Sequence, residues 1–197
     1  MNAFLVFVAG YALGSVPFGV MISRAKGVDL STVGSGNVGA TNVNRALGWT
    51  WALLVFVLDV GKGLLPGLLA WQIFTSHQVE WAFAAGLAGV AGHCASPFLR
   101  FKGGKGVAAG LGAIMGSTPY IGCGALLVFL VFMAASQMVS LASLAACVSL
   151  IPFDLMFNAP KPVMAGHLAM ILFIFYRHRA NISRIRRGEE PKFRLKN

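Results

Sequence analysis

The sequence contains few charged residues for its length. Lys and Arg together number 16, Asp and Glu only 6, and charged residues make up 11% of the 197 positions. A soluble domain of this size carries about 25% charged residues. Apolar residues make up 57% of the chain, and the mean hydropathy is +0.74. This composition excludes an ordinary soluble enzyme, a disordered protein and, despite a net charge of +10, a nucleic-acid-binding domain. It predicts an all-α integral membrane protein.

Cysteine is also scarce. Cys94, Cys123 and Cys147 each stand alone in an apolar stretch, without a CxxC or CxxxC pair. This spacing supports neither a zinc site nor a disulfide framework, so we expect small buried hydrophobic residues and no metal. Residues Met1–Ala12 lack a basic stretch and a small-residue cleavage site. The first apolar run is therefore expected to be a retained membrane span.

Long apolar runs predict the membrane helices, because about 20 residues of helix cross a hydrocarbon core of ~30 Å. One run, Val107–Ser136, has 30 residues, which is long for one crossing and short for two. Ser117-Thr118-Pro119 interrupts it, and a proline fits best at the start of a second helix. The other apolar runs are Ala3–Ser23, Trp49–Phe74, Trp81–Leu99, Leu141–Phe157 and Val163–Tyr176.

The basic residues predict the topology. They collect in Arg24–Gly48, in Arg100–Gly106 and in the tail from Arg177, and such segments stay in the cytoplasm. The N-terminus is then outside, the C-terminus is cytoplasmic and the number of crossings is odd. Seven transmembrane helices result if Val107–Ser136 crosses twice, which also places Gln137–Ser143 in the cytoplasm; five is the alternative. We expect one membrane domain over residues 1–183, followed by an exposed basic cytoplasmic tail over 184–197.

The polar residues gather in four clusters, of which the first is Val33–Arg45. Its glycines permit a close backbone approach. Its short side chains offer hydrogen-bond donors, and Arg45 can form a bidentate fork to a phosphate or a carboxylate. A capped turn that leads into a short interfacial helix is an equally good interpretation of these residues.

The second cluster is Gly92–Gly106. A turn of Gly103-Gly104-Lys105-Gly106 before a helix brings backbone N–H groups and a lysine to the positive end of the helix dipole, which favours phosphate binding. It is not a Walker A loop, because the G-x-x-x-x-G-K-[ST] spacing is absent. A simple basic turn at the membrane surface explains the lysine but not the glycine pattern.

The remaining clusters are Met138–Ser143, whose serines by themselves indicate helix capping, and Tyr176–Asn181. His178 and Asn181 are three residues apart, so one helical face can present both. Seven crossings place all four clusters on the cytoplasmic side, and none of them contains a carboxylate. The clusters thus predict a site for more than one phosphate. Elsewhere, Asp59 and Lys62 predict an intramembrane ion pair and His167 a hydrogen-bonded packing residue.

The four clusters together resemble the bacterial acyl-phosphate:glycerol-3-phosphate acyltransferase family, PlsY. The resemblance rests on Ser35–Asn42, Gly92–Gly106, Val139–Ser143 and Tyr176–Asn181, in this order and spacing. It implies transfer of a fatty acyl group from acyl phosphate to the 1-hydroxyl of glycerol 3-phosphate, which gives 1-acyl-glycerol 3-phosphate (lysophosphatidic acid) early in phospholipid biosynthesis. It further implies a seven-helix, multi-pass enzyme of the bacterial cytoplasmic (inner) membrane.

The resemblance implies catalytic roles for Ser35, Lys105 and His178. His178 is assigned to binding first, and its action as a base stays open. Ser140 stands in the same motif as Ser143 and is the alternative to it. The implied substrate-binding residues are Asn37, Gly39, Thr41, Asn42, Arg45, Gly103, Gly104, Ser143 and Asn181.

The expected partners are glycerol 3-phosphate, acyl phosphate and membrane lipid, with the soluble enzyme that makes acyl phosphate (PlsX) as a further candidate. No cofactor and no nucleic acid is expected. The H-x-x-x-x-D signature is absent after all four histidines, which argues against an acyl-CoA-dependent acyltransferase. A transporter for a phosphate-bearing metabolite would need polar groups at the midplane on broken helices, and only Asp59 and Lys62 qualify. A non-catalytic scaffold would leave the polar clusters unexplained.

Overall fold

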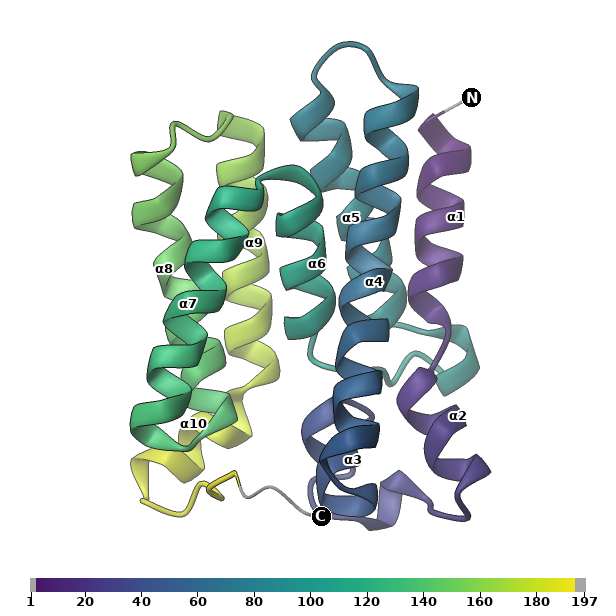
Figure 1. The fold of residues 1–197 in the computed structure, drawn as a ribbon, viewed down its shortest axis with the longest axis vertical. Helices are drawn as coiled ribbons and strands as arrows, with labels where there is room; N and C mark the ends of the chain where they lie inside the picture. The colour runs from purple at the N-terminus through teal and green to yellow at the C-terminus, as the bar shows by residue number, and fades with distance from the viewer. Residues whose placement is uncertain (1–2, 194–197) are drawn as a thin grey trace.

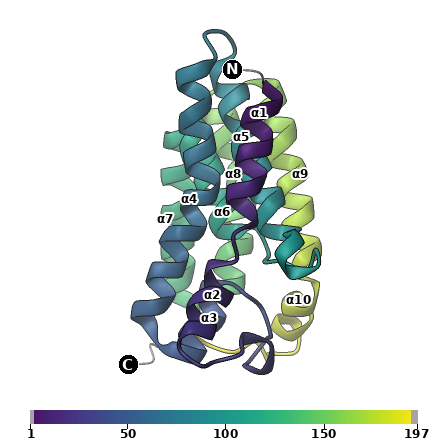
Figure 2. The ribbon, with the colours of Figure 1, turned by 90° about the vertical axis from the view of Figure 1, so that its right-hand side faces the viewer.

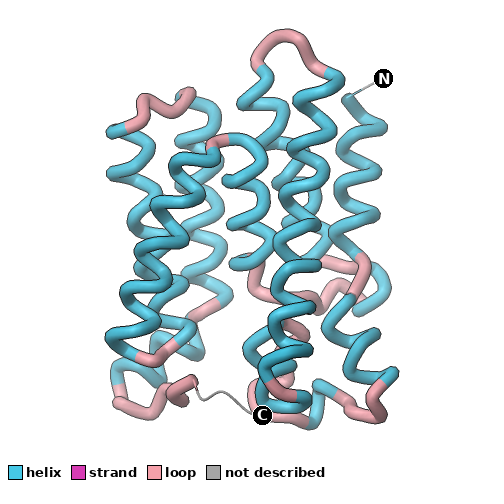
Figure 3. Tube along the Cα trace, in the orientation of Figure 1, coloured by secondary structure: helices cyan, strands magenta, loops and turns pink. Residues whose placement is uncertain are grey.

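The computed structural model describes residues 3–193, and this part of the chain is helical without a β-strand (Figure 3). The all-α prediction is thereby confirmed. Three short helices, α2, α3 and α10, gather at one end of a bundle of longer helices (Figures 1 and 2). The helices are α1 (Ala3–Ser15), α2 (Phe18–Ala25), α3 (Ala40–Leu47), α4 (Trp49–Ile73), α5 (Gln78–Cys94), α6 (Val107–Ser117), α7 (Pro119–Ser136), α8 (Val139–Met156), α9 (Lys161–Arg177) and α10 (Arg179–Arg186).

Several helices have the length and composition of membrane spans. Five segments of the described chain are both long and apolar enough to cross a bilayer. Helix α6, with 11 residues, and helix α9, with 17, are shorter. The five segments are Ala3–Ala25, Trp49–Ile73, Gln78–Leu99, Pro119–Ser136 and Val139–Met156.

The 30-residue apolar run contains two helices. Helix α6 ends at Ser117, and α7 begins at Pro119 and runs back beside α6 (Figure 1). The predicted helix start at Pro119 is confirmed, since proline occupies the first turn of α7. With 11 residues, α6 is only ~16 Å long. The turn before α6 therefore lies deeper in the bundle than α3 and α10 (Figures 1 and 2).

The first apolar run is also divided. Helix α1 ends at Ser15 and α2 begins at Phe18. Pro17, between them, has no amide hydrogen to donate and its ring obstructs a continuous helix. Helix α2 consequently leaves the line of α1 and runs toward the end of the bundle that carries α3 (Figure 2).

Small residues let the helices approach closely. A Cβ on Gly63 of α4 would overlap the carbonyl oxygen of Ala109 on α6, and a Cβ on Gly89 of α5 would overlap that of Lys62 on α4. Such close backbone contacts are typical of helix packing in lipid, where apolar side chains gain little from association. They hold α4, α5 and α6 at fixed relative positions.

Two buried polar pairs join helical residues inside the bundle. The Nζ atom of Lys62 lies 2.6 Å from Oδ1 of Asp59, which confirms the predicted ion pair. The Nδ1 atom of His167 lies 2.8 Å from Oδ1 of Asp154, so His167 is a hydrogen-bonded packing residue as predicted. The second pair links α9 to α8.

Candidate active site

An open cavity of about 660 Å³ lies among α3, the start of α6, α8 and α10. All four polar clusters contribute to its wall, including His93 of α5 from the second cluster, together with Asp59 of α4. The structure therefore brings together residues that are far apart in the chain. The predicted site residues in its lining are Ser35, Asn37, Gly39, Thr41, Asn42, Arg45, Lys105, Ser143, His178 and Asn181.

The first cluster forms a loop that is held by its own asparagines. The buried Asn42 side chain accepts a hydrogen bond from the Ser35 amide at 3.3 Å and donates one to the Leu30 carbonyl at 3.1 Å. Asn37 accepts a hydrogen bond from the Gly39 amide at 3.1 Å. These bonds shape the loop that leads into α3. The turn precedes the short helix α3, although no side chain of residues 3–193 caps that helix. It also lines the cavity, and phosphate binding by it stays a prediction.

The glycine turn of the second cluster differs from the expectation. The Gly103 amide donates to the Cys94 carbonyl at 3.0 Å, and the Gly104 amide donates to the His93 carbonyl at 3.1 Å. Both glycines lie outside the cavity lining. Their amides are therefore engaged by the end of α5 in this conformation and do not face a phosphate, so these two glycines shape the turn.

Other parts of this segment do reach the cavity. Gly106 has a φ of +87° and precedes α6, whose first residues line the cavity next to Lys105. The first amides of a helix have no partner within the helix and favour anions. The amides that face the cavity are thus those at the start of α6, and anion binding by them stays a prediction.

Arg177 holds the turn from the opposite side. Its Nη2 atom donates to the Gly103 carbonyl at 2.7 Å and to the Gly104 carbonyl at 2.8 Å. The sequence placed Arg177 inside a motif but gave no sign that it contacts a loop 74 residues earlier. The turn is therefore fixed between α5 and α9.

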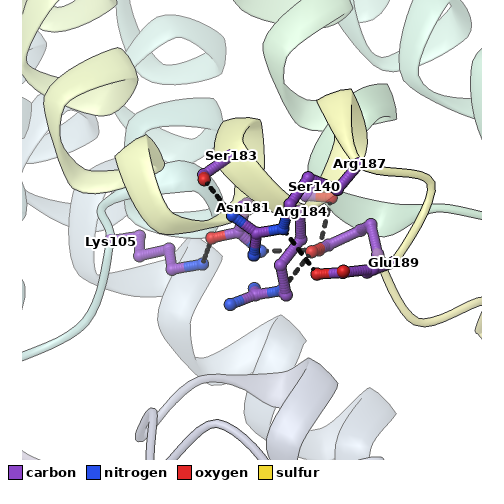
Figure 4. A network of polar contacts seen from close by, with 8 residues as sticks. Lys105, Ser140, Asn181, Ser183, Arg184, Arg187 and Glu189 are labelled. Carbon is purple, nitrogen blue, oxygen red and sulfur yellow. Dashed lines mark hydrogen bonds and ion pairs between the residues drawn. The ribbon is translucent and has the colours of Figure 1, made fainter.

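A chain of hydrogen bonds crosses the cavity wall (Figure 4). Lys105 donates from Nζ to Oδ1 of Asn181 at 2.6 Å, and Asn181 donates from Nδ2 to Oε1 of Glu190 at 2.6 Å. The Glu190 carboxylate also accepts from Oγ of Ser140 and from Nε of Arg184, each at 2.7 Å. Four segments of the chain meet in this network.

Glu190 is the main residue that the sequence reasoning missed. The four clusters contain no carboxylate, yet Asp59 and Glu190 bring two into the cavity lining. Part of the tail, which we expected to be exposed, is folded back onto the cavity, whereas Arg186 and Arg187 are exposed. Gly188 turns the chain with a φ of +70°, and the Phe193 amide donates to the Gln137 carbonyl at 2.6 Å. The basic tail residue Arg184 and residues 190–193 line the cavity; residues 194–197 of the predicted tail lie outside the described residues.

Burial controls the protonation of Lys105 and His178. It lowers the pKa of Lys105 to about 8, and the neighbouring Arg184, Arg45 and Arg177 act in the same direction, whereas Glu190 opposes the shift. Burial also lowers the pKa of His178 to about 4, and the charge of Lys105 adds to this effect. At pH 7 the site therefore holds a charged lysine beside a neutral histidine.

The tautomer of His178 follows from its partner. Its Nδ1 atom lies 2.9 Å from the carbonyl oxygen of Ile174, and a carbonyl can only accept. In the neutral ring Nδ1 therefore carries the hydrogen, and Nε2 presents a lone pair. His178 can accept a hydrogen bond, or a proton, at Nε2.

Glu190 is ionised in the site. Burial would raise the pKa of its carboxyl group, but the hydrogen bonds from Ser140, Asn181 and Arg184 outweigh this and lower it.

The two serines of the third cluster have different hydrogen-bond partners. Ser140 binds Glu190, whereas Ser143 donates to the Val139 carbonyl at 2.7 Å.

A narrow apolar recess of about 60 Å³ adjoins the cavity. It shares Phe56, Val107, Ala108, Phe129 and Ser143 with the cavity wall and continues between α6, α7, α8 and α9. The site thus combines a cationic polar part with an apolar extension. Within residues 3–193, His, Cys, Asp and Glu form no group of three that could hold a metal ion.

Comparison with known proteins finds relatives that match nearly the whole chain. The family described as glycerol-3-phosphate acyltransferase matches residues 4–188. The chain is 44% identical over 195 residues to the glycerol-3-phosphate acyltransferase of Aquifex aeolicus, covering 98% of this chain and all of the relative. The glycerol-3-phosphate acyltransferase of Geobacter sulfurreducens is 38% identical, and the match covers 98% of this chain and 99% of that relative.

Two crystal structures share the fold. Both are of PlsY, an integral membrane glycerol 3-phosphate acyltransferase. Its glycerol 3-phosphate form has a TM-score of 0.91 and 42% identity, covering 98% of this chain and 96% of that one. Its lysophosphatidic acid form has a TM-score of 0.88 and 41% identity, covering 98% and 95%.

Proposed function

The chain belongs to the glycerol-3-phosphate acyltransferase family, and from this we propose that it uses acyl phosphate as its acyl donor. The 1-hydroxyl oxygen of glycerol 3-phosphate forms the ester bond to the acyl carbon, and the bond from that carbon to the donor phosphate breaks. The hydroxyl proton leaves with the released phosphate. The products are 1-acyl-glycerol 3-phosphate, which is a precursor of phospholipids, and phosphate.

The observation that carries the proposal is the pairing of a cationic cavity with an apolar recess. Arg45, Lys105 and the start of α6 line the same cavity and can neutralise two phosphates that would otherwise repel each other. Acyl phosphate is an activated anhydride, so it needs no covalent acyl-enzyme. Bringing the two anions together and orienting the hydroxyl is then the main catalytic task.

The polar side of the cavity suits glycerol 3-phosphate. Lys105 and Asn181 are hydrogen-bonded there, and Lys105 can exchange this bond for one to the substrate phosphate. The lone pair at Nε2 of His178 can accept a hydrogen bond from the 1-hydroxyl and orient it toward the acyl carbon. Ser35 in the first loop and Arg45 on α3 line the same cavity.

The recess, of about 60 Å³, suits the carbonyl end of the donor's acyl chain. It begins at Val107, Phe129 and Ser143, which also line the cavity, and its wall is almost wholly apolar beyond them. A chain in this recess would place the acyl phosphate group at the start of α6, where the free amides favour an anion. Ser143 is then near the acyl carbon, which supports its assignment to substrate binding.

We further propose seven crossings by α1, α4, α5, α6, α7, α8 and α9, with the N-terminus outside and the cavity facing the cytoplasm. Because α6 is too short to cross alone, the turn before it completes this crossing. The alternation of these helices along the bundle (Figure 1) and the basic residues near α2, α3 and α10 support this arrangement. The protein is an integral membrane protein, and the bacterial cytoplasmic membrane is its proposed location. Delivery of acyl phosphate by the PlsX enzyme is part of the same proposal.

Turnover of the purified protein in detergent tests the donor. Glycerol 3-phosphate and palmitoyl phosphate should give lysophosphatidic acid, whereas palmitoyl-CoA and palmitoyl acyl carrier protein should not. Comparable rates with palmitoyl-CoA would reverse the donor assignment.

A further inference from the structure

The proposed reaction leaves a buried polar cluster beneath the glycine turn without a role, although Asp59 and His93 of this cluster reach the cavity wall. The cluster consists of Asp59 and Lys62 on α4 and His93 on α5, which are 2%, 3% and 7% exposed. The Nζ atom of Lys62 lies 2.6 Å from Oδ1 of Asp59 and 3.4 Å from Nδ1 of His93, and that Nδ1 lies 3.5 Å from Oδ1 of Asp59. Charged groups in a membrane helix are costly and usually functional. Apolar residues would pack these helices without that cost.

The cluster reaches the glycine turn through His93. A Cβ on Gly104 would overlap Nε2 of the His93 ring, so the ring lies directly against the Gly104 α-carbon. The carbonyl group of His93 also accepts the Gly104 amide at 3.1 Å. Gly104 is therefore in contact with both the side chain and the backbone of His93.

The orientation of the His93 ring depends on its neighbours. Nδ1 of His93 faces both groups of the pair, with Nζ of Lys62 at 3.4 Å and Oδ1 of Asp59 at 3.5 Å, so Nε2 is turned toward the glycine turn. Asp59 in turn holds Lys62 in place. Nε2 of His93 packs against the Gly104 α-carbon, and this is the contact of the ring with the turn.

We propose that His93, oriented by the Asp59–Lys62 pair, is a positioning residue for the glycine turn and, through it, for Lys105. On the other side of the turn, Arg177 binds the Gly103 and Gly104 carbonyl groups. A displaced turn would move Lys105 away from the phosphate of glycerol 3-phosphate and would therefore weaken the binding of that substrate. This inference rests on the proposed function, because it assigns Lys105 to that substrate.

The test replaces His93 by asparagine and measures steady-state kinetics in detergent. His93→Asn should raise the KM for glycerol 3-phosphate about tenfold while kcat changes less than threefold, because substrate binding is lost before chemistry. His167→Asn is the matched control, since His167 is also a buried histidine paired with an aspartate. His167→Asn should lower the thermal stability of the protein and change the KM for glycerol 3-phosphate by less than about twofold relative to the wild type.

An unchanged KM in His93→Asn, or an equal rise in His167→Asn, would overturn the inference. If His93→Asn does not fold, Gly104→Ala is compared with the double variant Gly104→Ala, His93→Ala. Removing the ring makes room for the added methyl group, so the double variant should bind glycerol 3-phosphate at least about threefold more tightly than Gly104→Ala. If the double variant does not recover binding, the contact between His93 and Gly104 is contradicted.

The inference and the proposed function can fail separately. A wild-type protein without turnover contradicts the proposed function. The same variants are then compared by equilibrium binding of inorganic phosphate, in which His93→Asn should bind more weakly than His167→Asn. Equal binding by the two variants would overturn the positioning role.

Discussion

The Nζ atom of Lys105 donates a hydrogen bond to Oδ1 of Asn181 at 2.6 Å, although the two residues are 76 positions apart in the chain. Because Nδ2 of Asn181 donates to Glu190, the amide cannot reverse without losing both bonds. This contact joins the loop before α6 to α10 (Figure 4). It also places the charge of Lys105 at the polar end of the cavity, and several predictions rest on that placement.

Lys105→Ala should inactivate the enzyme and leave it folded in the membrane. A lost charge-assisted contact to phosphate costs ~2–4 kcal/mol, which corresponds to a fall of roughly 30- to 1000-fold in kcat/KM. Lys102→Ala is the control, because Lys102 is an exposed lysine of the same loop and should retain activity. Near-normal turnover of Lys105→Ala would refute the assignment of Lys105 to phosphate.

The activity should fall as the pH rises through about 8, the pKa of Lys105. Burial lowers this pKa, so the ammonium group is present below it and is lost above it. A guanidinium group stays protonated over this range. Lys105→Arg, even if it is slower, should therefore move the alkaline limb of the kcat/KM profile to higher pH. If the limb does not move, it reports the titration of another group.

Glu190→Gln should move the same alkaline limb to lower pH. The carboxylate of Glu190 favours the charged form of Lys105, so its neutralisation lets the pKa of Lys105 fall further below its usual value. Glu189→Gln is the matched control, since Glu189 is exposed and pairs with Arg187. Equal pH profiles for the two variants would contradict an electrostatic role of Glu190.

His178→Gln should retain more activity than His178→Asn. The carboxamide of glutamine reaches the position of Nε2, which we assign to the substrate hydroxyl, whereas that of asparagine reaches the position of Nδ1, which binds Ile174. The comparison uses kcat/KM for glycerol 3-phosphate. The opposite ranking would indicate that Nδ1 is the functional atom.

A cysteine at Gln137 should react with an impermeant thiol reagent only from the cytoplasmic side, in a protein without Cys94, Cys123 and Cys147. Gln137 is exposed in the turn between α7 and α8, and Asn158 is exposed in the turn between α8 and α9. The two turns are separated by a bilayer of ~30 Å in the seven-crossing topology. Asn158→Cys should thus react only from outside. Labelling of Gln137→Cys from outside would refute seven crossings and remove Ser143 from the cytoplasmic site.

Local sequence properties determined the class of the protein and the composition of its site. The low charge and the long apolar runs require lipid around most of the chain, whatever the arrangement of the helices. Pro119 ends one helix and starts the next because proline lacks an amide hydrogen, so the sequence predicts the division between α6 and α7. The polar clusters were also recognisable, because polar residues stand out where apolar ones dominate.

The tertiary structure alone decided which of these groups meet and what each one does. Glu190 enters the cavity only because the chain reverses at Gly188, and its bond to Ser140 joins residues 50 positions apart. Whether the Gly104 amide is available to an anion depends on the end of α5, since the His93 carbonyl accepts it. Contacts of this kind are set by how the helices pack, and neither hydrophobic periodicity nor motif spacing reports that.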